Sequence, residues 1–224
     1  MFNDEVTSQI VGKVKIYDKD TGKVLLEKKN AIHPGNMAYV LASALAGKPT
    51  SVNSAGAPPI VNWMAFGNGG SNSTTTLEYR APRVFGNYDQ LPITASNSTL
   101  YAKVYEQETV NTVYYAGEVM DSNESVPVNT AKIVCSVEVN HTAYEDAVKI
   151  VDPSLNLPET DSSPDMLSVN AFTIDEIGLM AGVTTNGDMD ESKTTMLTHV
   201  TFHPVLLSAN RTIIIDYTIT IQVN

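Results

Sequence analysis

Histidine is the side chain most often used for general-base catalysis and metal binding near neutral pH, so the four histidines are the first candidates for chemistry. None of them lies in the Gly-x-Ser-x-Gly context of a serine nucleophile. His199 and His203 are four residues apart. On a strand this spacing places them on one face but more than about 10 Å apart, too far to share a zinc ion, and no His-Glu-x-x-His motif is present. His33 stands beside Pro34 and is expected in a loop, and His141 is the fourth histidine. We predict no catalytic residue and no metal site at these histidines.

Three segments are similar to ligand-binding loops, but each lacks essential residues. The glycine-rich run at 67–70 (GNGG) follows an apolar stretch, yet it has neither the Walker Lys-Ser/Thr pair nor dinucleotide-binding spacing, so we predict a tight turn with close backbone packing. Asp18 and Asp20 lack the further ligands of a calcium loop, so we predict a hairpin turn. Residues 186–191 (NGDMDE) could hold a hydrated cation weakly, but a solvated hairpin tip is the favoured interpretation.

Two carboxylates and one thiol remain. Asp175 and Glu176 are adjacent, so on a regular strand they face opposite sides and cannot act as a catalytic pair, although a β-bulge is expected at this point. Cys135 is the only cysteine and lies in an apolar strand pattern, so we predict a small buried side chain and no disulfide within the chain. We therefore predict that the protein is not an enzyme and uses no cofactor.

The C-terminal stretch 196–224 organises the predicted fold. Val200 and Phe202 alternate with polar residues until Pro204, which is expected to stop that run. Apolar residues then occupy every odd position from Ile213 to Val223, and polar residues occupy every even position from Asp216 to Gln222. Such a pattern, built from β-branched and aromatic residues, predicts a long strand with one buried face. We expect this strand to be paired on both edges and covered by a second layer.

A hairpin and one helix are predicted before it. Residues 10–28 form the hairpin, and Gly22 supplies a positive φ in its turn. The residues His33 to Asn36 signal a helix start, and Gly47 is a natural C-cap. Between them a single apolar stripe is formed by Met37, Val40, Leu41, Ala44 and Leu45.

Further strands are predicted at 61–66, 131–139 and 171–180, and the strands at 100–105 and 112–115 are expected to pair with each other. Long loop excursions are expected near 71–98 and 151–168. We therefore predict that residues 1–224 form one all-β domain, an antiparallel β-sandwich with one short helix. A jelly-roll-like topology is one arrangement that this sandwich could have.

Composition restricts the function. The chain of 224 residues has 42% hydrophobic and 17% charged residues, which is typical of a globular protein. The 25 acidic and 14 basic residues give a charge of −11, which favours solubility and argues against direct nucleic-acid binding. The N-terminus has no basic and apolar leader, and no apolar run approaches 18 residues, so we expect synthesis in a cytoplasm and no membrane contact.

The segment 77–98 has no clear periodicity and holds several aromatic and basic side chains. Long excursions of this kind often carry contacts between subunits. The interface candidates are Tyr79, Arg80, Arg83, Phe85 and Tyr88. An ordered surface loop without a partner is the alternative.

Several segments together resemble a family of tailed-bacteriophage virion structural proteins. Residues 29–46 (KNAIHPGNM and the following helix) are similar to a family turn that enters a short helix, and 64–70 (MAFGNGG) resembles a strand that ends in F-G-N-G-G. In the second half, 172–179 (FTIDEIGL) and 197–205 (LTHVTFHPV) resemble two further family strands. These motifs lie in order along most of the chain, whereas 71–168 matches no family pattern.

The resemblance implies a homo-oligomeric collar, neck or tail protein of the virion, whose partners are other virion proteins and copies of itself. A capsid decoration protein is the alternative within this class. A receptor- or carbohydrate-binding fibre module is the alternative from another class, with Tyr79, Phe85, Tyr88 and Asp89 as candidate contacts. The resemblance transfers no catalytic residues.

Overall fold

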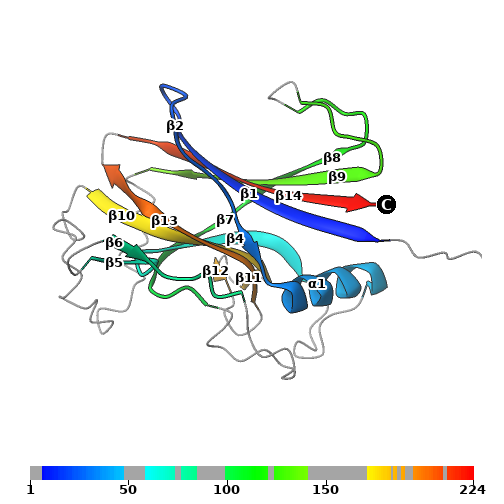
Figure 1. The fold of residues 1–224 in the computed structure, drawn as a ribbon, viewed down its shortest axis with the longest axis horizontal. Coiled ribbons are helices and arrows are strands. Elements are labelled where there is room, and N and C mark those ends of the chain that lie inside the picture. Colours follow the sequence, from blue (N-terminus) through cyan, green and yellow to red (C-terminus); the bar gives the residue numbers. More distant parts are fainter. Residues whose placement is uncertain are drawn as a thin grey trace, which may run out of the picture.

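Two five-stranded antiparallel sheets pack face to face (Figure 1), and one helix lies beside them. This computed structural model describes residues 7–47, 59–73, 77–84, 99–120, 124–140, 171–182, 184–185, 188–189, 194–208 and 211–224. The first sheet has the order β2-β1-β14-β9-β8, with bounds Val24–Lys29, Ser8–Asp18, Ile213–Val223, Thr130–Val139 and Val110–Tyr115. The second has the order β3-β13-β10-β4-β7, with bounds Ala31–Ile32, Thr195–Ser208, Ala171–Gly182, Ile60–Gly67 and Lys103–Glu108. The predicted all-β sandwich with one short helix is confirmed.

The C-terminal strand β14 is the central strand of the first sheet, as predicted. It pairs with β1 on one side and with β9 on the other. Ile213, Ile215, Tyr217 and Ile219 are buried, while the residues between them are only partly buried. The apolar half of the alternating pattern therefore faces the second sheet, because burying these side chains is the main driving force for packing the two layers together.

The bounds of the helix and of the first hairpin agree with the predictions, but the predicted apolar stripe of the helix is buried only at Met37 and Val40, whereas Ala44 and Leu45 are exposed. Helix α1 (Pro34–Ala46) ends at Gly47, which adopts the left-handed conformation with φ of 59°. Gly22 in the β1–β2 turn has φ of 67°. His33 has a more specific role than the expected loop position, because it is the N-cap, and its Nδ1 accepts a hydrogen bond from the backbone N–H of Asn36 at 3.2 Å.

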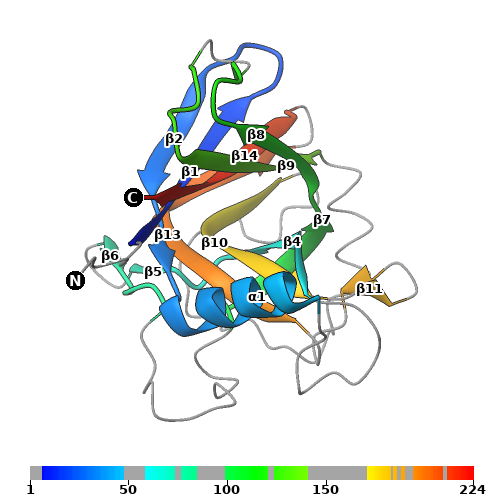
Figure 2. The ribbon, with the colours of Figure 1, turned by 90° about the vertical axis from the view of Figure 1, so that its right-hand side faces the viewer.

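The predicted pairing of the strands at 100–105 and 112–115 is wrong. β7 and β8 belong to different sheets, since β7 pairs with β4 and β8 pairs with β9. Only Thr109 separates them, and its N–H donates to the carbonyl of Asn62 at 2.8 Å, which fixes the crossing. On the opposite side of the sandwich, Asn30 alone separates β2 from β3 in the same way. The chain thus passes directly between the layers at both sides (Figure 2).

Pro204 does not end a strand, which corrects a second expectation. β13 continues through it to Ser208, because the ladder with β10 shifts register beside it. Ile174 pairs with Val205 and Glu176 pairs with Thr201, so Asp175 alone faces three residues of β13. This irregularity, the bulge expected at Asp175 and Glu176, accommodates a proline that cannot donate a ladder hydrogen bond.

The predicted loop excursions are only partly described. Short strands β5 (Ser71–Ser73) and β6 (Leu77–Tyr79) pair within the first excursion, and β11 (Thr184–Thr185) pairs with β12 (Asp188–Met189) around the predicted acidic tip. Residues 85–98 and 151–168 lie outside the described residues.

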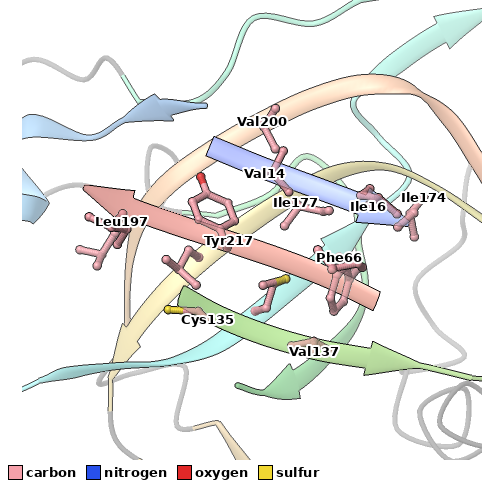
Figure 3. Packing of buried hydrophobic residues seen from close by; sticks show 14 of the residues in the cluster. Val14, Ile16, Phe66, Cys135, Val137, Ile174, Ile177, Leu197, Val200 and Tyr217 are labelled. Carbon is pink, nitrogen blue, oxygen red and sulfur yellow. The ribbon is translucent and has the colours of Figure 1, made fainter. Parts of the chain in front are cut away.

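The apolar core fills the space between the sheets (Figure 3). Tyr217 and Cys135 from the first sheet face Phe66 and Ile177 from the second, and all four are at most 1% exposed. The predicted burial of Cys135 is confirmed. Met37 and Val40 of α1 join the same cluster, so the helix is part of the core rather than an appendage.

Candidate functional site

The strands that carry the motif segments are neighbours in the second sheet. β10 lies between β4 and β13, so Glu176 stands opposite Gly67 on one side and Thr201 on the other. Segments more than 100 residues apart in sequence therefore meet at one carboxylate. This meeting point, with the loops around it, is the strongest candidate for a functional site.

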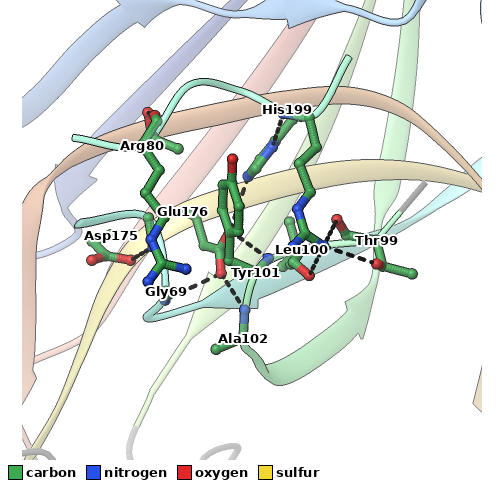
Figure 4. Close-up of polar contacts among 12 residues, drawn as sticks. Gly69, Arg80, Thr99, Leu100, Tyr101, Ala102, Asp175, Glu176 and His199 are labelled. Atoms are coloured by element: carbon green, nitrogen blue, oxygen red, sulfur yellow. Dashed lines mark hydrogen bonds and ion pairs between the residues drawn. The ribbon is translucent and has the colours of Figure 1, made fainter. Parts of the chain in front are cut away.

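Glu176 is 0% exposed and accepts four hydrogen bonds (Figure 4). Its Oε1 accepts from the N–H of Gly69 at 3.2 Å and from the N–H of Ala102 at 2.8 Å. Its Oε2 accepts from the N–H of Tyr101 at 3.0 Å and from Nε2 of His199 at 2.9 Å. Burial opposes ionisation, but the bonds from His199, Ala102 and Tyr101 outweigh it, and the pKa of the carboxyl is lowered.

His199, also 0% exposed, uses both ring nitrogens within the chain. Nδ1 accepts the backbone N–H of Arg83 at 2.7 Å, so the ring proton resides on Nε2 and is donated to Glu176. This is the neutral tautomer, with neither nitrogen left for a substrate or a metal. The pair therefore joins three segments: the turn after β4, the loop before β7, and the loop that contains Arg83.

Asp175 holds the same turn from its other side. Its carboxylate accepts from the N–H of Gly70 at 2.7 Å, from the N–H of Ser71 at 2.9 Å, and from the Ser71 hydroxyl. Desolvation by burial raises the pKa of this carboxyl despite these bonds. The two adjacent carboxylates thus bind different parts of one glycine-rich turn.

The glycines of that turn are required by the space available. A Cβ at Gly67 would lie 2.5 Å from the carbonyl oxygen of Ala102, and a Cβ at Gly70 would lie 2.5 Å from the carbonyl oxygen of Asp175. A Cβ at Gly69 would lie 2.7 Å from the Cβ of Tyr101. The predicted tight turn with close backbone packing is confirmed, and the carboxylates occupy the side that a phosphate would need.

Cationic and aromatic side chains cover the outer side of the buried pair. The guanidinium groups of Arg83 and Arg80 lie 4.0 and 4.9 Å from the ring centroid of Tyr101. The Tyr101 hydroxyl donates to the carbonyl of Ala81 at 2.7 Å. Arg83 Nη1 donates to the carbonyl of Leu100 at 3.2 Å, which ties the two loops together. We call this group of residues, 79–83 and 99–102, the arginine loops.

Three of the five predicted interface residues lie in these loops. Tyr79 is 52% exposed, its hydroxyl lies 3.3 Å from Nδ1 of His203, and Lys28 lies over its ring at 5.9 Å. Arg80 is exposed and Arg83 is half-buried. Phe85 and Tyr88, with the alternative receptor contact Asp89, lie outside the described residues.

The three histidines in the described part of the chain lie at separate places. His33 caps α1 and has its pKa lowered by burial, His199 is enclosed at the site, His203 is exposed beside Tyr79, and His141 lies outside the described residues. Within the described ranges, no cluster of three or more His, Cys, Asp or Glu side chains is arranged to hold a metal ion.

Spacing along the sequence did not reveal the Glu176–His199 pair. A signal existed, because a carboxylate within the apolar run Ile174 to Met180 needs a buried partner. The partner itself could not be identified, since it comes from another strand and its second nitrogen binds a loop more than 100 residues away.

Comparison with protein-family models, curated proteins and solved structures finds no match for this chain. In the part of the chain that the structure describes, the helix falls short of the length and apolar character needed to cross a membrane.

Proposed function

We propose that this protein is a structural component of a bacteriophage particle, a homo-oligomeric collar, neck or tail protein that acts through contacts with its copies and with other virion proteins. One observation carries the proposal. The segments that resemble virion proteins, at 64–70, 172–179 and 197–205, contribute side chains or backbone groups to one buried network centred on Glu176.

The chemistry of that network supports a scaffold. Both oxygens of Glu176 and both ring nitrogens of His199 are satisfied by the chain itself. A buried carboxylate with four donors is costly to disturb, because any donor or acceptor left unpaired loses its hydrogen bond without regaining water. The network thus holds loops in one conformation, which repeated assembly of identical copies requires.

The surface above the network supports contacts with other proteins. The arginine loops present exposed Tyr79 and Arg80 on a chain whose net charge is −11. Tyrosine and arginine are enriched at protein interfaces, and a cationic surface on an acidic protein attracts acidic partners. A neighbouring copy, with its net charge of −11, is an acidic partner of this kind.

Purified phage particles provide the test. Quantitative mass spectrometry of particles should detect the protein at a fixed copy number, and cryo-electron microscopy should locate it. About a dozen copies at the head–tail junction agree with a neck or collar protein, whereas hundreds of copies on the capsid indicate the decoration alternative. Absence from particles, or specific binding on a glycan array by the isolated protein, would contradict the assembly role.

A further inference from the structure

The edge strand β8 carries an unusual concentration of exposed apolar side chains. Val110 is 74% exposed, Val113 44% and Tyr115 62%. Val119 and Val128, in the connection from β8 to β9, are 59% and 78% exposed. Successive side chains of a strand point to opposite faces, so Val110 lies on one face of β8 and Val113 and Tyr115 lie on the other. A protein that pairs with the edge of β8 would cover both groups.

β8 also lacks the features that normally protect a sheet edge. Natural edge strands carry charged residues, proline or bulges that prevent pairing with another chain. In the described sheets, β2 carries Glu27, Lys28 and Lys29, β7 carries charged residues at both ends, and β3 has only two residues. β8 reads VNTVYY, with no charge and no proline, and its ladder with β9 is regular.

The backbone groups on the open side of β8 can be identified. The N–H of Tyr115 donates to Oε2 of Glu118 at 2.6 Å, and its carbonyl accepts from the N–H of Glu118 at 3.0 Å, so both point away from β9. Alternate residues of an antiparallel strand direct their backbone groups to the same side. Asn111 and Val113 therefore present their N–H and C=O groups at the open edge.

We infer that β8 is the interface with a second copy of this chain, which adds its own β8 antiparallel across a two-fold axis at Thr112. In this register Asn111 of one copy and Val113 of the other exchange backbone hydrogen bonds. The N–H and the C=O of each of these outward-facing residues therefore both find a partner. A register centred on Val113 would need the N–H of Tyr115, which Glu118 already occupies.

Side chains and charge favour the same partner. Asn111 lies opposite Cys135, which is buried, so Val110, Thr112 and Tyr114 lie on the outer face. The two-fold register places Val110 of one copy opposite Tyr114 of the other, a favourable β-branched–aromatic pair. The six residues of β8 carry no charge, so two copies with a net charge of −11 each meet at this strand without placing like charges opposite each other.

The inference deepens the proposed assembly role and rests on it, since it names the partner as a second copy.

Cysteine cross-linking tests the register. Thr112 would form a non-hydrogen-bonded pair with itself, with Cα atoms about 4.5 Å apart, a distance that a disulfide spans. Val110 would lie about 13 Å from its own copy, since the two are offset by four residues along the strands. The native Cys135 is buried and does not interfere.

The experiment oxidises T112C and V110C with copper phenanthroline and air and runs them on a non-reducing gel. T112C should give a band at twice the protomer mass, and V110C should remain at the protomer mass. Equal cross-linking of both, or of neither, would overturn the inference.

Light scattering provides the second readout. T112K places two lysines opposite each other at the axis and should raise the dissociation constant of the dimer at least about tenfold. V24K, at an exposed β-branched residue on the other edge of the same sheet, is the matched control and should leave the mass unchanged. Circular dichroism establishes that both variants fold.

The two proposals fail separately. A wild-type chain that is a monomer in solution, or a T112K variant that keeps the wild-type mass, overturns the β8 interface and leaves the particle measurement to decide the function. A wild-type dimer with the expected cross-link, from a protein absent from particles, overturns the proposed function and keeps the interface.

Discussion

Nε2 of His199 lies 2.9 Å from Oε2 of Glu176, and neither side chain is exposed to solvent. Because Nδ1 of the same ring accepts the backbone N–H of Arg83, the carboxylate is connected through the imidazole to the arginine loops. The stability of these loops therefore depends on the identity of two residues from neighbouring strands.

Replacing Glu176 by glutamine should destabilise the protein strongly. The amide NH₂ group cannot accept the backbone N–H bonds that one carboxylate oxygen now accepts, and the charge that strengthens all four bonds is lost. We expect the free energy of unfolding to fall by about 3 kcal/mol, as for other buried charged networks that lose one partner. Urea denaturation measures this change.

Glu138→Gln is the control for that variant. Glu138 pairs with Lys19 at 2.7 Å on the surface, with about half of each side chain exposed. Exposed pairs contribute at most about 1 kcal/mol, so the control should change stability little. Equal losses in the two variants would show that the buried network has no special stabilising role.

Replacing Gly70 by alanine tests whether the lack of space for a Cβ atom is the reason that this turn requires glycine. The new Cβ would lie 2.5 Å from the backbone oxygen of Asp175, so the turn must shift and the bonds from Gly70 and Ser71 must lengthen. We expect a loss of about 1–3 kcal/mol, typical of overpacking. Thermal denaturation followed by circular dichroism provides the measurement.

Gly35→Ala in α1 is the matched control, with an expected change of opposite sign. The nearest atom to its Cβ would be Cε1 of His33 at 3.7 Å, an ordinary contact. Alanine favours a helix over glycine by up to about 1 kcal/mol, so this variant should be slightly more stable than the wild type. A destabilised Gly35→Ala together with a neutral Gly70→Ala would contradict the packing argument.

Asp18 should contribute to acid denaturation. Hydrogen bonds from the hydroxyl and backbone N–H of Thr21, together with Arg211, lower its pKa from 3.8 to about 2. The folded-state pKa lies below the unfolded value, so the stabilisation is present above pH 3.8 and is lost as the pH falls towards 2. Asp18→Asn should therefore show a shallower decline of stability over this window than the wild type.

Urea midpoints measured across the window test this expectation. Asp20→Asn, at an exposed residue of the same turn, is the control and should follow the wild-type curve. If Asp18→Asn and the wild type decline in parallel, the Thr21 and Arg211 contacts do not carry the pH dependence.

Cys135 should be inert in the folded protein. It is 0% exposed, and desolvation by burial raises the pKa of its thiol to about 12. The thiolate is the reactive form, so a colorimetric disulfide reagent at mildly alkaline pH should label the native chain only as fast as it unfolds. Urea should release one reactive thiol per chain, whereas rapid labelling without urea would contradict the burial.

Local patterns along the chain were sufficient to predict several elements. The alternation from Ile213 to Val223 predicted a long strand with one buried face, because a strand turns successive side chains to opposite sides. The helix from Pro34 and its end at Gly47 were equally predictable, since capping and proline preferences act over only a few residues.

Contacts between distant segments decided the rest. β7 and β8 appear as neighbouring hairpin strands in the sequence, yet Thr109 directs them into different sheets because Asn62 of β4 accepts its N–H. Pro204 remains inside β13 only because β10 bulges beside it. The bond from His199 to Glu176 likewise exists because β10 and β13 pair in one register, and a pairing register depends on the whole sheet rather than on local sequence.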